Sequence, residues 1–248
     1  GQDRMLGTRP FQPHRKMAEQ IRDAVSDHIR ARGLKAGDRI PTEADLCAAF
    51  GVSRPTVREA LRLLEQERLI DGSAIRVGDR IIGLASSGVH SNGFSLARNV
   101  LFEKGGLRAG DSDSGLEGPV GEELLKPTKI YVKSLLNLLK NFNVKGLVHI
   151  TGGGFIDNIP RIVPSPCAAV IGRKQWPVPP IFRVIQEMGN VEEEEIFRVF
   201  NMGIGMIVIV PDKEAADAME RLAMLGEKPY LLGAIEKRSP EQPRIVLV

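Results

Sequence analysis

The sequence changes its pattern once, near residues 71–73, and this change limits the folds that the chain can adopt. Up to that point apolar residues recur at helical spacing and glycine is rare. Beyond it, short runs rich in β-branched residues alternate with helical stretches and glycine-rich turns. No internal repeat and no proline- or serine-rich linker joins the two parts. The pattern therefore predicts two abutting modules.

The predicted fold class is α+β. We expect a flexible tail at 1–14, a three-helix module at 15–73, and a layered α/β module with a mixed sheet at 74–248. With 248 residues, of which 42% are hydrophobic and 26% charged, the chain can bury a core. The formal net charge of +3 singles out no class of partner, so any nucleic-acid contact depends on where the charges lie.

Composition and motifs exclude several classes of protein. No apolar run reaches the roughly 18 residues of a membrane span, and residues 1–15 lack the apolar core of a signal peptide. Cys47 and Cys167 form no C-x-x-C motif, and neither cysteine nor histidine has zinc-ligand spacing, so no metal site is predicted. We find no P-loop, no G-x-G-x-x-G and no G-x-S-x-G. We therefore expect a cytoplasmic protein without membrane contact.

The first module contains three predicted helices. Apolar residues at helical spacing between 17 and 29 give the first, which stops at Gly33. Thr42 and Asp45, three residues apart, predict a capping box at the start of the second, and Gly51 ends it in a left-handed turn. Ser53 is the predicted cap of the third helix.

The third predicted helix has one apolar face and one polar face. The apolar face leaves five side chains on the outer, N-terminal part: Ser53, Arg54, Thr56, Arg58 and Arg62. A helix fits the major groove, arginine can pair bidentately with guanine, and hydroxyls can hold phosphate. These five residues are the candidate DNA-binding set. The alternative is a structural three-helix bundle whose arginines are only solvated.

Two loops of the second module carry candidate ligand-binding residues. The first follows a strand at 79–87 and opens a helix at 94–102; it contains Ser86, Ser87, Gly88, His90, Ser91 and Asn92. Small hydroxyls and backbone N–H groups at such a place favour an anion, although a self-satisfied polar turn is the other interpretation. The second loop follows a strand at 147–150 and consists of Thr151, Gly152, Gly153 and Gly154. His149, just before it, is a candidate catalytic base or hydrogen-bond donor, or else a structural histidine.

The first module resembles a known family of regulators. The string GLKAGDRIPTEADLCAAFGVSRPTVREALRLLEQERLI is similar to the winged helix-turn-helix of GntR-type bacterial transcription regulators. The resemblance implies that Arg54, Thr56 and Arg58 read double-stranded DNA. Two departures stand out: Arg68 occupies a position that is usually glycine, and the wing is not recognisable, so we expect weakened phosphate contacts.

The second module resembles a purine-biosynthesis enzyme. The strings GDRIIGLASSGVHSNGFSLARNVL, VKGLVHITGGGFIDNIPR and EEEIFRVFNMGIGM are similar to the C-terminal domain of the aminoimidazole ribonucleotide synthetase (phosphoribosylformylglycinamidine cyclo-ligase) family. The resemblance implies ATP-dependent imidazole ring closure in a cleft between two domains. It places both loops on the substrate, with His149, Asn158, Arg161 and Asn201 nearby.

In that family an N-terminal domain with much of the ATP and metal site comes first, whereas here the helix-turn-helix stands in its place. We therefore expect no cofactor to be bound by this chain alone; ATP and Mg are implied only if the other half is supplied. The leading hypothesis is a DNA-binding regulator head fused to a domain that binds a phosphoribosyl purine precursor. A homodimer is one of the assemblies that this hypothesis allows. The alternative is a cyclo-ligase, or a fragment that needs a separate ATP-binding half. A third hypothesis is a fusion with neither activity.

Overall fold

A computed structural model describes residues 17–34, 40–66, 70–112, 115–116 and 118–248. The expected tail at 1–14 and Arg68 lie outside the described residues. The chain divides into two compact units, Gly1–Leu69 and Ile70–Val248. The first is helical, and the second combines helices with a mixed sheet, so the predicted α+β class is confirmed.

The first unit is a three-helix module built around a small apolar core. Its helices are α1 (Met17–Arg32), α2 (Glu43–Phe50) and α3 (Arg54–Gln66). Five side chains, at least one from each helix, are fully buried: Ile21, Val25, Leu46, Val57 and Ala60. Because Val57 and Ala60 are three residues apart, they place one face of α3 on the core and leave the opposite face outside.

The predicted helix ends of this unit are confirmed. The Thr42 hydroxyl accepts a hydrogen bond from the Asp45 N–H at 3.2 Å, and the Asp45 carboxylate accepts one from the Thr42 N–H at 2.9 Å. The Thr42 hydroxyl also donates to the Asp45 carboxylate at 2.6 Å, and this bond, together with the one from the Thr42 N–H, lowers the pKa of Asp45. Gly33 and Gly51 have φ values of 59° and 63°, the left-handed conformation that ends a helix. The backbone oxygen of Ser53 accepts from the Val57 N–H at 3.2 Å, which puts Ser53 at the cap position of α3.

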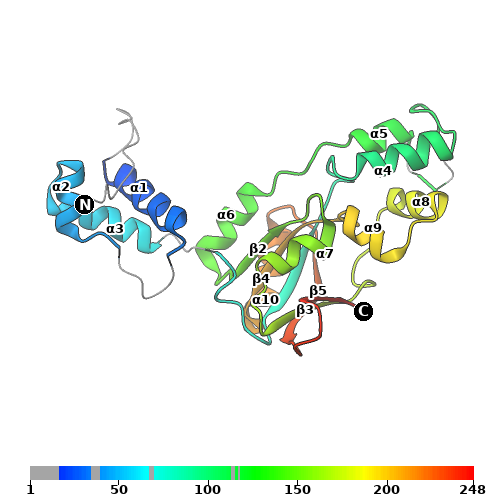
Figure 1. Cartoon of the computed structure of the whole chain (residues 1–248). Coiled ribbons are helices and arrows are strands. Elements are labelled where there is room, and N and C mark those ends of the chain that lie inside the picture. The colour runs from blue at the N-terminus through cyan, green and yellow to red at the C-terminus, as the bar shows by residue number, and fades with distance from the viewer. Residues whose placement is uncertain (1–16, 35–39, 67–69, 113–114, 117) are drawn as a thin grey trace. The chain divides into compact units, whose positions relative to one another are not determined.

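A six-stranded mixed sheet forms the centre of the second unit (Figure 1). Its spatial order is β2-β4-β1-β5-β3-β6, and every neighbouring pair is antiparallel except β3 and β6. The strands are β1 (Arg80–Ala85), β2 (Gly146–His149), β3 (Cys167–Ile171), β4 (Ile204–Val210), β5 (Pro229–Lys237) and β6 (Ile245–Leu247).

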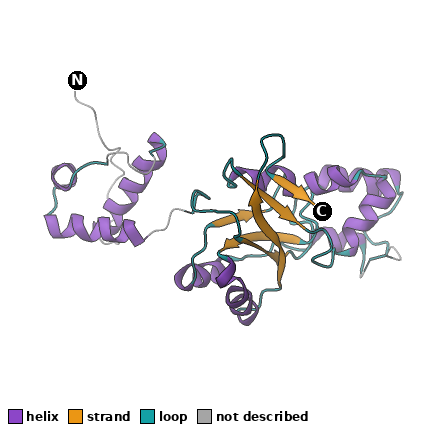
Figure 2. Cartoon of the chain, turned by 90° about the horizontal axis from the view of Figure 1, so that it is seen from below, coloured by secondary structure: helices purple, strands orange, loops and turns teal. Residues whose placement is uncertain are grey.

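Helices cover both faces of the sheet (Figure 2). On one face Ile82 and Leu84 of β1 pack with α6 (Val132–Asn141) and α10 (Asp212–Met224). On the other face Ile81 joins a larger core. That core is covered by α4 (Phe94–Arg98), a π-helix (Asn99–Lys104), α5 (Val120–Leu125), α7 (Gly154–Asn158), a 3-10 helix (Ile159–Arg161), α8 (Pro180–Gly189) and α9 (Glu193–Val199).

Residues 70–79 fold with the second unit. Ile75 is 1% exposed within the larger core. Gly72 has φ 83°, and a Cβ atom there would lie 2.0 Å from the carbonyl oxygen of Ile162. Residues 70–79 form turns and bends without a strand, so they contain no wing hairpin. No described helix combines the length and apolar character needed to cross a membrane.

We expect Gly72→Ala to destabilise the second unit strongly, because its methyl group collides with a backbone carbonyl. The matched variant is Gly78→Ala, where φ is 93° but no atom lies within 4 Å. Left-handed strain alone costs about 1–2 kcal/mol, and overpacking adds about 1–3 kcal/mol. Urea unfolding of the full chain measures both. Equal losses of unfolding free energy would show that residues 70–79 are not packed on the second unit.

Candidate functional site

The outer face of α3 presents polar and cationic side chains. Ser53, Arg54 and Arg58 are exposed, and Thr56 is partly exposed with its hydroxyl 3.1 Å from that of Ser53. The side chain of Arg62 is not among those that the structure describes. Because Val57 and Ala60 hold the opposite face in the core, this surface is positioned by packing. It combines two guanidinium groups with hydroxyls at a helix N-terminus, a combination suited to a polyanion.

Arg58 has a partner that the sequence did not reveal. Its Nε donates to both carboxylate oxygens of Glu43, at 3.3 and 3.2 Å. Glu43 is the first residue of α2, directly after the Thr42 cap. The pair therefore connects the start of α2 to α3.

The first ligand-binding loop is held from beneath by a buried amide. Asn201 is fully buried; its Nδ2 donates to the Gly88 carbonyl at 2.8 Å, and its Oδ1 accepts from the Gly203 N–H at 2.8 Å. The Ser86 hydroxyl donates to Gly88 O at 3.0 Å and lies 3.1 Å from the Asn201 Oδ1. Through these contacts Asn201 holds the loop in place and acts as a clamp on it. Its position beside the substrate stays a prediction.

His90 is buried within the same loop in its neutral form. Its Nε2 accepts hydrogen bonds from the backbone N–H groups of Ser87 at 3.0 Å and Lys129 at 3.3 Å. A nitrogen that accepts two N–H bonds carries no proton, so the neutral ring holds its proton on Nδ1. That atom is buried and has no partner among the described residues. Burial, with the nearby charges of His149 and Lys129, lowers the pKa of His90 to about 4.

Three rings come together beside this loop. The ring centroids of His90, Tyr131 and His149 lie 6.3 to 6.5 Å apart. Tyr131 donates to the Ala85 carbonyl at 2.8 Å; burial, together with the charge of Glu227, raises the pKa of its hydroxyl. His149, at the end of β2, is exposed and is the member of the trio that a ligand can reach. Tyr131 was not predicted, because an isolated tyrosine ahead of a helix carries no local signal.

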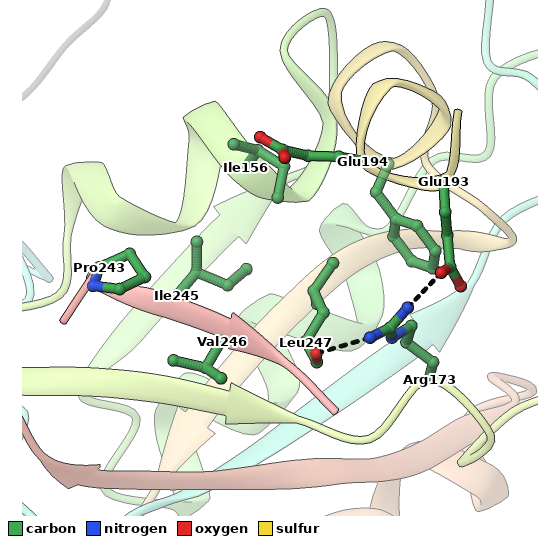
Figure 3. Close-up of a pocket in the computed structure, with 9 residues that line it drawn as sticks. Ile156, Arg173, Glu193, Glu194, Pro243, Ile245, Val246 and Leu247 are labelled. Carbon is green, nitrogen blue, oxygen red and sulfur yellow. Dashed lines mark hydrogen bonds and ion pairs between the residues drawn. The ribbon is translucent and has the colours of Figure 1, made fainter. Parts of the chain in front are cut away.

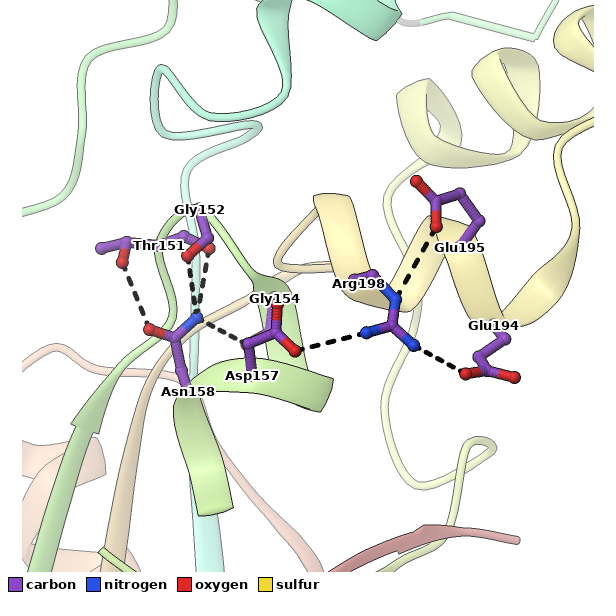
Figure 4. Close-up of polar contacts among 8 residues, drawn as sticks. All are labelled: Thr151, Gly152, Gly154, Asp157, Asn158, Glu194, Glu195 and Arg198. Atoms are coloured by element: carbon purple, nitrogen blue, oxygen red, sulfur yellow. Dashed lines mark hydrogen bonds and ion pairs between the residues drawn. The ribbon is translucent and has the colours of Figure 1, made fainter. Parts of the chain in front are cut away.

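The second loop is held in the same way as the first (Figure 4). The Asn158 Nδ2 donates to the Gly154 carbonyl at 2.7 Å and to that of Gly152 at 3.3 Å. The Thr151 hydroxyl lies 3.4 Å from the Asn158 Oδ1. Gly154 has φ 53°, and a Cβ there would lie 2.0 Å from the Phe197 carbonyl oxygen, so only glycine fits against the end of α9. Asn158 is therefore also a clamp.

An unpredicted arginine connects the two helices behind this loop (Figure 4). Arg198 of α9 pairs with Asp157 of α7 at 3.3 Å and with Glu194 and Glu195 at 2.7 and 3.7 Å. Glu194 and Glu195 lie in the exposed first turn of α9, and both of their carboxylates pair with this arginine.

The two loops approach each other at Asn92 and Gly152. A Cβ on Gly152 would lie 3.9 Å from the Asn92 Oδ1. Ser91 and Gly152 are exposed, and Ser91 has φ 57°. Gly153, with φ 100°, directly precedes α7. Arg161 is exposed at the end of the 3-10 helix, and the described contacts join it to neither loop.

A cavity of about 360 Å³ opens beside Ser86 and Ser87. Its wall includes Lys126, Lys228 and Glu123, with the remainder from Ala85, Gly203, Tyr230 and the run 177–180. Lys126 pairs with Glu123 at 2.7 Å. The lining therefore carries one more positive than negative charge, which favours an anionic ligand.

A second cavity, of about 420 Å³, is lined by residues outside the predicted site (Figure 3). Ile156, Phe197, Ile245 and Leu247 make much of its wall. Arg173 enters this wall, but its guanidinium already pairs with Glu193 and donates to the Leu247 carbonyl at 3.0 Å. No cluster of metal-ligating side chains is found among the described residues.

Comparisons with known proteins divide the chain in the same way. The family model of the AIR synthase related protein C-terminal domain matches residues 76–245, and that of the gntR family of bacterial regulatory proteins matches residues 17–77. The phosphoribosylformylglycinamidine cyclo-ligase of Syntrophus aciditrophicus (strain SB) is 59% identical over 183 residues, which cover 74% of this chain and 53% of that protein. That of Syntrophotalea carbinolica is 52% identical over 187 residues, covering 75% and 53%. The chain spans about half the length of these relatives.

We expect the stability of the second unit to fall as the pH drops from about 6.5 to about 4. In the unfolded chain His90 takes up a proton as the pH falls below its ordinary pKa of 6.5. In the folded chain it takes up that proton only near its lowered pKa of about 4. The folded state thus binds fewer protons than the unfolded state between these pH values. The free energy of unfolding therefore falls by roughly 3 kcal/mol across the window. Urea unfolding across the window measures it. His90→Asn, which tolerates a left-handed φ, should flatten the pH profile relative to the wild type, whereas His28→Asn, in α1 of the first unit, should leave it unchanged. An unchanged profile would contradict the burial of a neutral His90.

Proposed function

Since the chain belongs to the AIR synthase related family through its C-terminal domain and carries a gntR-type domain before it, we propose that it is a DNA-binding regulator that binds a phosphoribosyl purine precursor. Its DNA partner is double-stranded and is read by α3. Its small ligand contacts the two loops of the second unit. Neither role requires ATP or Mg, and we propose that this chain alone binds neither.

One observation carries the DNA-binding proposal: the polar face of α3 is open. Arg54 and Arg58 are exposed on it, while Val57 and Ala60 fix the helix from the other side. A helix held rigidly on a small core can enter the major groove without rearrangement, and each bidentate contact from arginine to guanine contributes about 1–3 kcal/mol of base discrimination. Residues 70–79 supply no wing strand, so α3 carries most of the readout.

The ligand proposal is supported by the two loops and by the cavity beside the first of them. The backbone of both loops is fixed by the buried amides of Asn158 and Asn201, so little ordering is needed when a ligand binds. The cavity of about 360 Å³ is within the range of small-molecule sites. Lys228, exposed at its wall, supplies the uncompensated positive charge that a phosphate would neutralise.

A second candidate function is cyclo-ligase activity. It is favoured by the 59% identity to a phosphoribosylformylglycinamidine cyclo-ligase. The segment that directly precedes the matched domain here is of gntR type, and the match covers 53% of that relative. We therefore expect turnover only when a separate ATP-binding half is added. Turnover of formylglycinamidine ribonucleotide and ATP by this chain alone would favour the enzyme over the regulator.

We expect Arg54→Ala to weaken binding to the preferred duplex by about 5- to 150-fold, because one base-reading contact is lost. The duplex is first selected from a random palindromic library with the full chain, and affinity is then measured by fluorescence polarisation across salt concentrations. Wild-type affinity should fall steeply as salt rises, because phosphate contacts release counterions.

Two variants control for charge. Arg54→Lys keeps the positive charge but cannot pair bidentately, so it should retain the salt dependence and lose base discrimination. Lys213→Ala removes an exposed positive charge from α10 and should leave binding unchanged. If Arg54→Ala binds the selected duplex like the wild type, α3 does not read DNA.

We expect formylglycinamidine ribonucleotide to bind the full chain without ATP, and Lys228→Met to weaken that binding about tenfold through loss of a charge-assisted contact. Titration calorimetry measures both, with Lys213→Met as the charge-matched control. The unphosphorylated nucleoside should bind much more weakly. Equal binding of nucleotide and nucleoside would contradict recognition of the phosphate.

A further inference from the structure

The contact between Glu43 and Arg58 determines which atoms of the arginine remain available. Both carboxylate oxygens of Glu43 accept from Nε of Arg58, at 3.3 and 3.2 Å. Within the described part of the chain, no contact engages the two terminal nitrogens, Nη1 and Nη2. The Arg58 side chain is 67% exposed and that of Glu43 is 40% exposed. The guanidinium is therefore tethered along one edge and open at its end.

Stability alone gives little reason for this pair. Ion pairs between exposed side chains contribute about 0–1 kcal/mol, and the start of α2 is already fixed by the Thr42–Asp45 capping box. Glu43 instead has two effects at the outer face of α3, the proposed DNA-binding surface. It restricts the rotamers of Arg58, and it places a negative charge beside the exposed guanidinium.

Resting on the proposed DNA binding by α3, we infer that Glu43 is a specificity-determining positioning residue, which holds Arg58 so that Nη1 and Nη2 meet a guanine end-on. With Nε occupied, the side-on geometry that uses Nε and one Nη is closed. A free Arg58 could also move to a phosphate, a contact that carries no sequence information. The Glu43 carboxylate disfavours that alternative by repulsion, so it weakens binding to wrong sequences more than to the right one.

The test measures the affinity of the full chain for the selected duplex and for a scrambled duplex of equal length. We expect Glu43→Gln to raise affinity for the scrambled duplex about twofold or more and to lower the ratio of the two affinities at least about fivefold, because a misplaced arginine loses most of a bidentate contact. A purely structural role for Glu43 would change both affinities together and leave the ratio unchanged.

Asp45→Asn is the matched control. It removes a carboxylate from the same first turn of α2, but one that contacts Thr42 instead of Arg58. It should raise affinity for both duplexes alike and keep their ratio. Circular dichroism shows whether each variant retains its helices. If Asp45→Asn lowers the ratio as much as Glu43→Gln, general repulsion accounts for the effect and the inference is wrong.

A double-mutant cycle shows whether Glu43 acts through Arg58. In an Arg58→Ala background, Glu43→Gln should no longer change the ratio, because the side chain that it positions is absent. A persistent effect would overturn the inference. Failure of the proposed DNA binding gives a different result from failure of this inference. If the chain does not read DNA, the wild type shows no preference for any duplex. If only the inference is wrong, the wild type keeps its preference and Arg54→Ala still weakens binding.

Discussion

Buried backbone groups need hydrogen-bond partners. The shapes of the two loops in the second unit depend on which side chains supply those partners. The chain leaves β1 and β2 through loops rich in small residues, whose carbonyl groups turn inward. Asn201 bonds to Gly88 beneath the first loop, and Asn158 bonds to Gly152 and Gly154 beneath the second. An unsatisfied buried polar group costs about 1–3 kcal/mol, so these two amides stabilise the loop shapes together with contacts inside the loops, such as the Ser86 hydroxyl on the Gly88 carbonyl. Ser91 and Gly152 remain exposed at the surface of the two loops.

The same division between fixed and available groups is found in the first unit. Three short helices bury one face each, and α3 keeps its polar face outside because Val57 and Ala60 hold the other. Glu43 then limits where Arg58 can go. In both units, the residues that hold the site in place were harder to predict from sequence than the residues that are exposed in it. Asn158 and Asn201 were expected near the substrate, which stays a prediction, and their bonds to the loop backbone were not foreseen; Glu43 was not considered.

Local signals predicted the elements that have them. The capping box at Thr42 and the left-handed Gly33 and Gly51 follow from residue type and spacing, and both are confirmed. The strands predicted at 79–87 and 147–150 correspond to β1 and β2 with shifted ends. The short strands β3 and β6 were not predicted. Their pairing joins segments more than 70 residues apart, and the local pattern of neither segment indicates such a partner.

The sequence by itself determined the α+β class, the division into a helical and a mixed module, and the families that each module resembles, because periodicity, capping residues and long motif strings are local properties. Only the tertiary structure decided that residues 70–79 pack with the second unit, that His90 is buried and neutral beside Tyr131 and His149, and that Glu43 holds Arg58. Each of these depends on a contact between residues distant in sequence, such as Gly72 against Ile162. Which distant partners meet is fixed by packing and by the pairing of buried polar groups, and neither can be read from the spacing of residues along the chain.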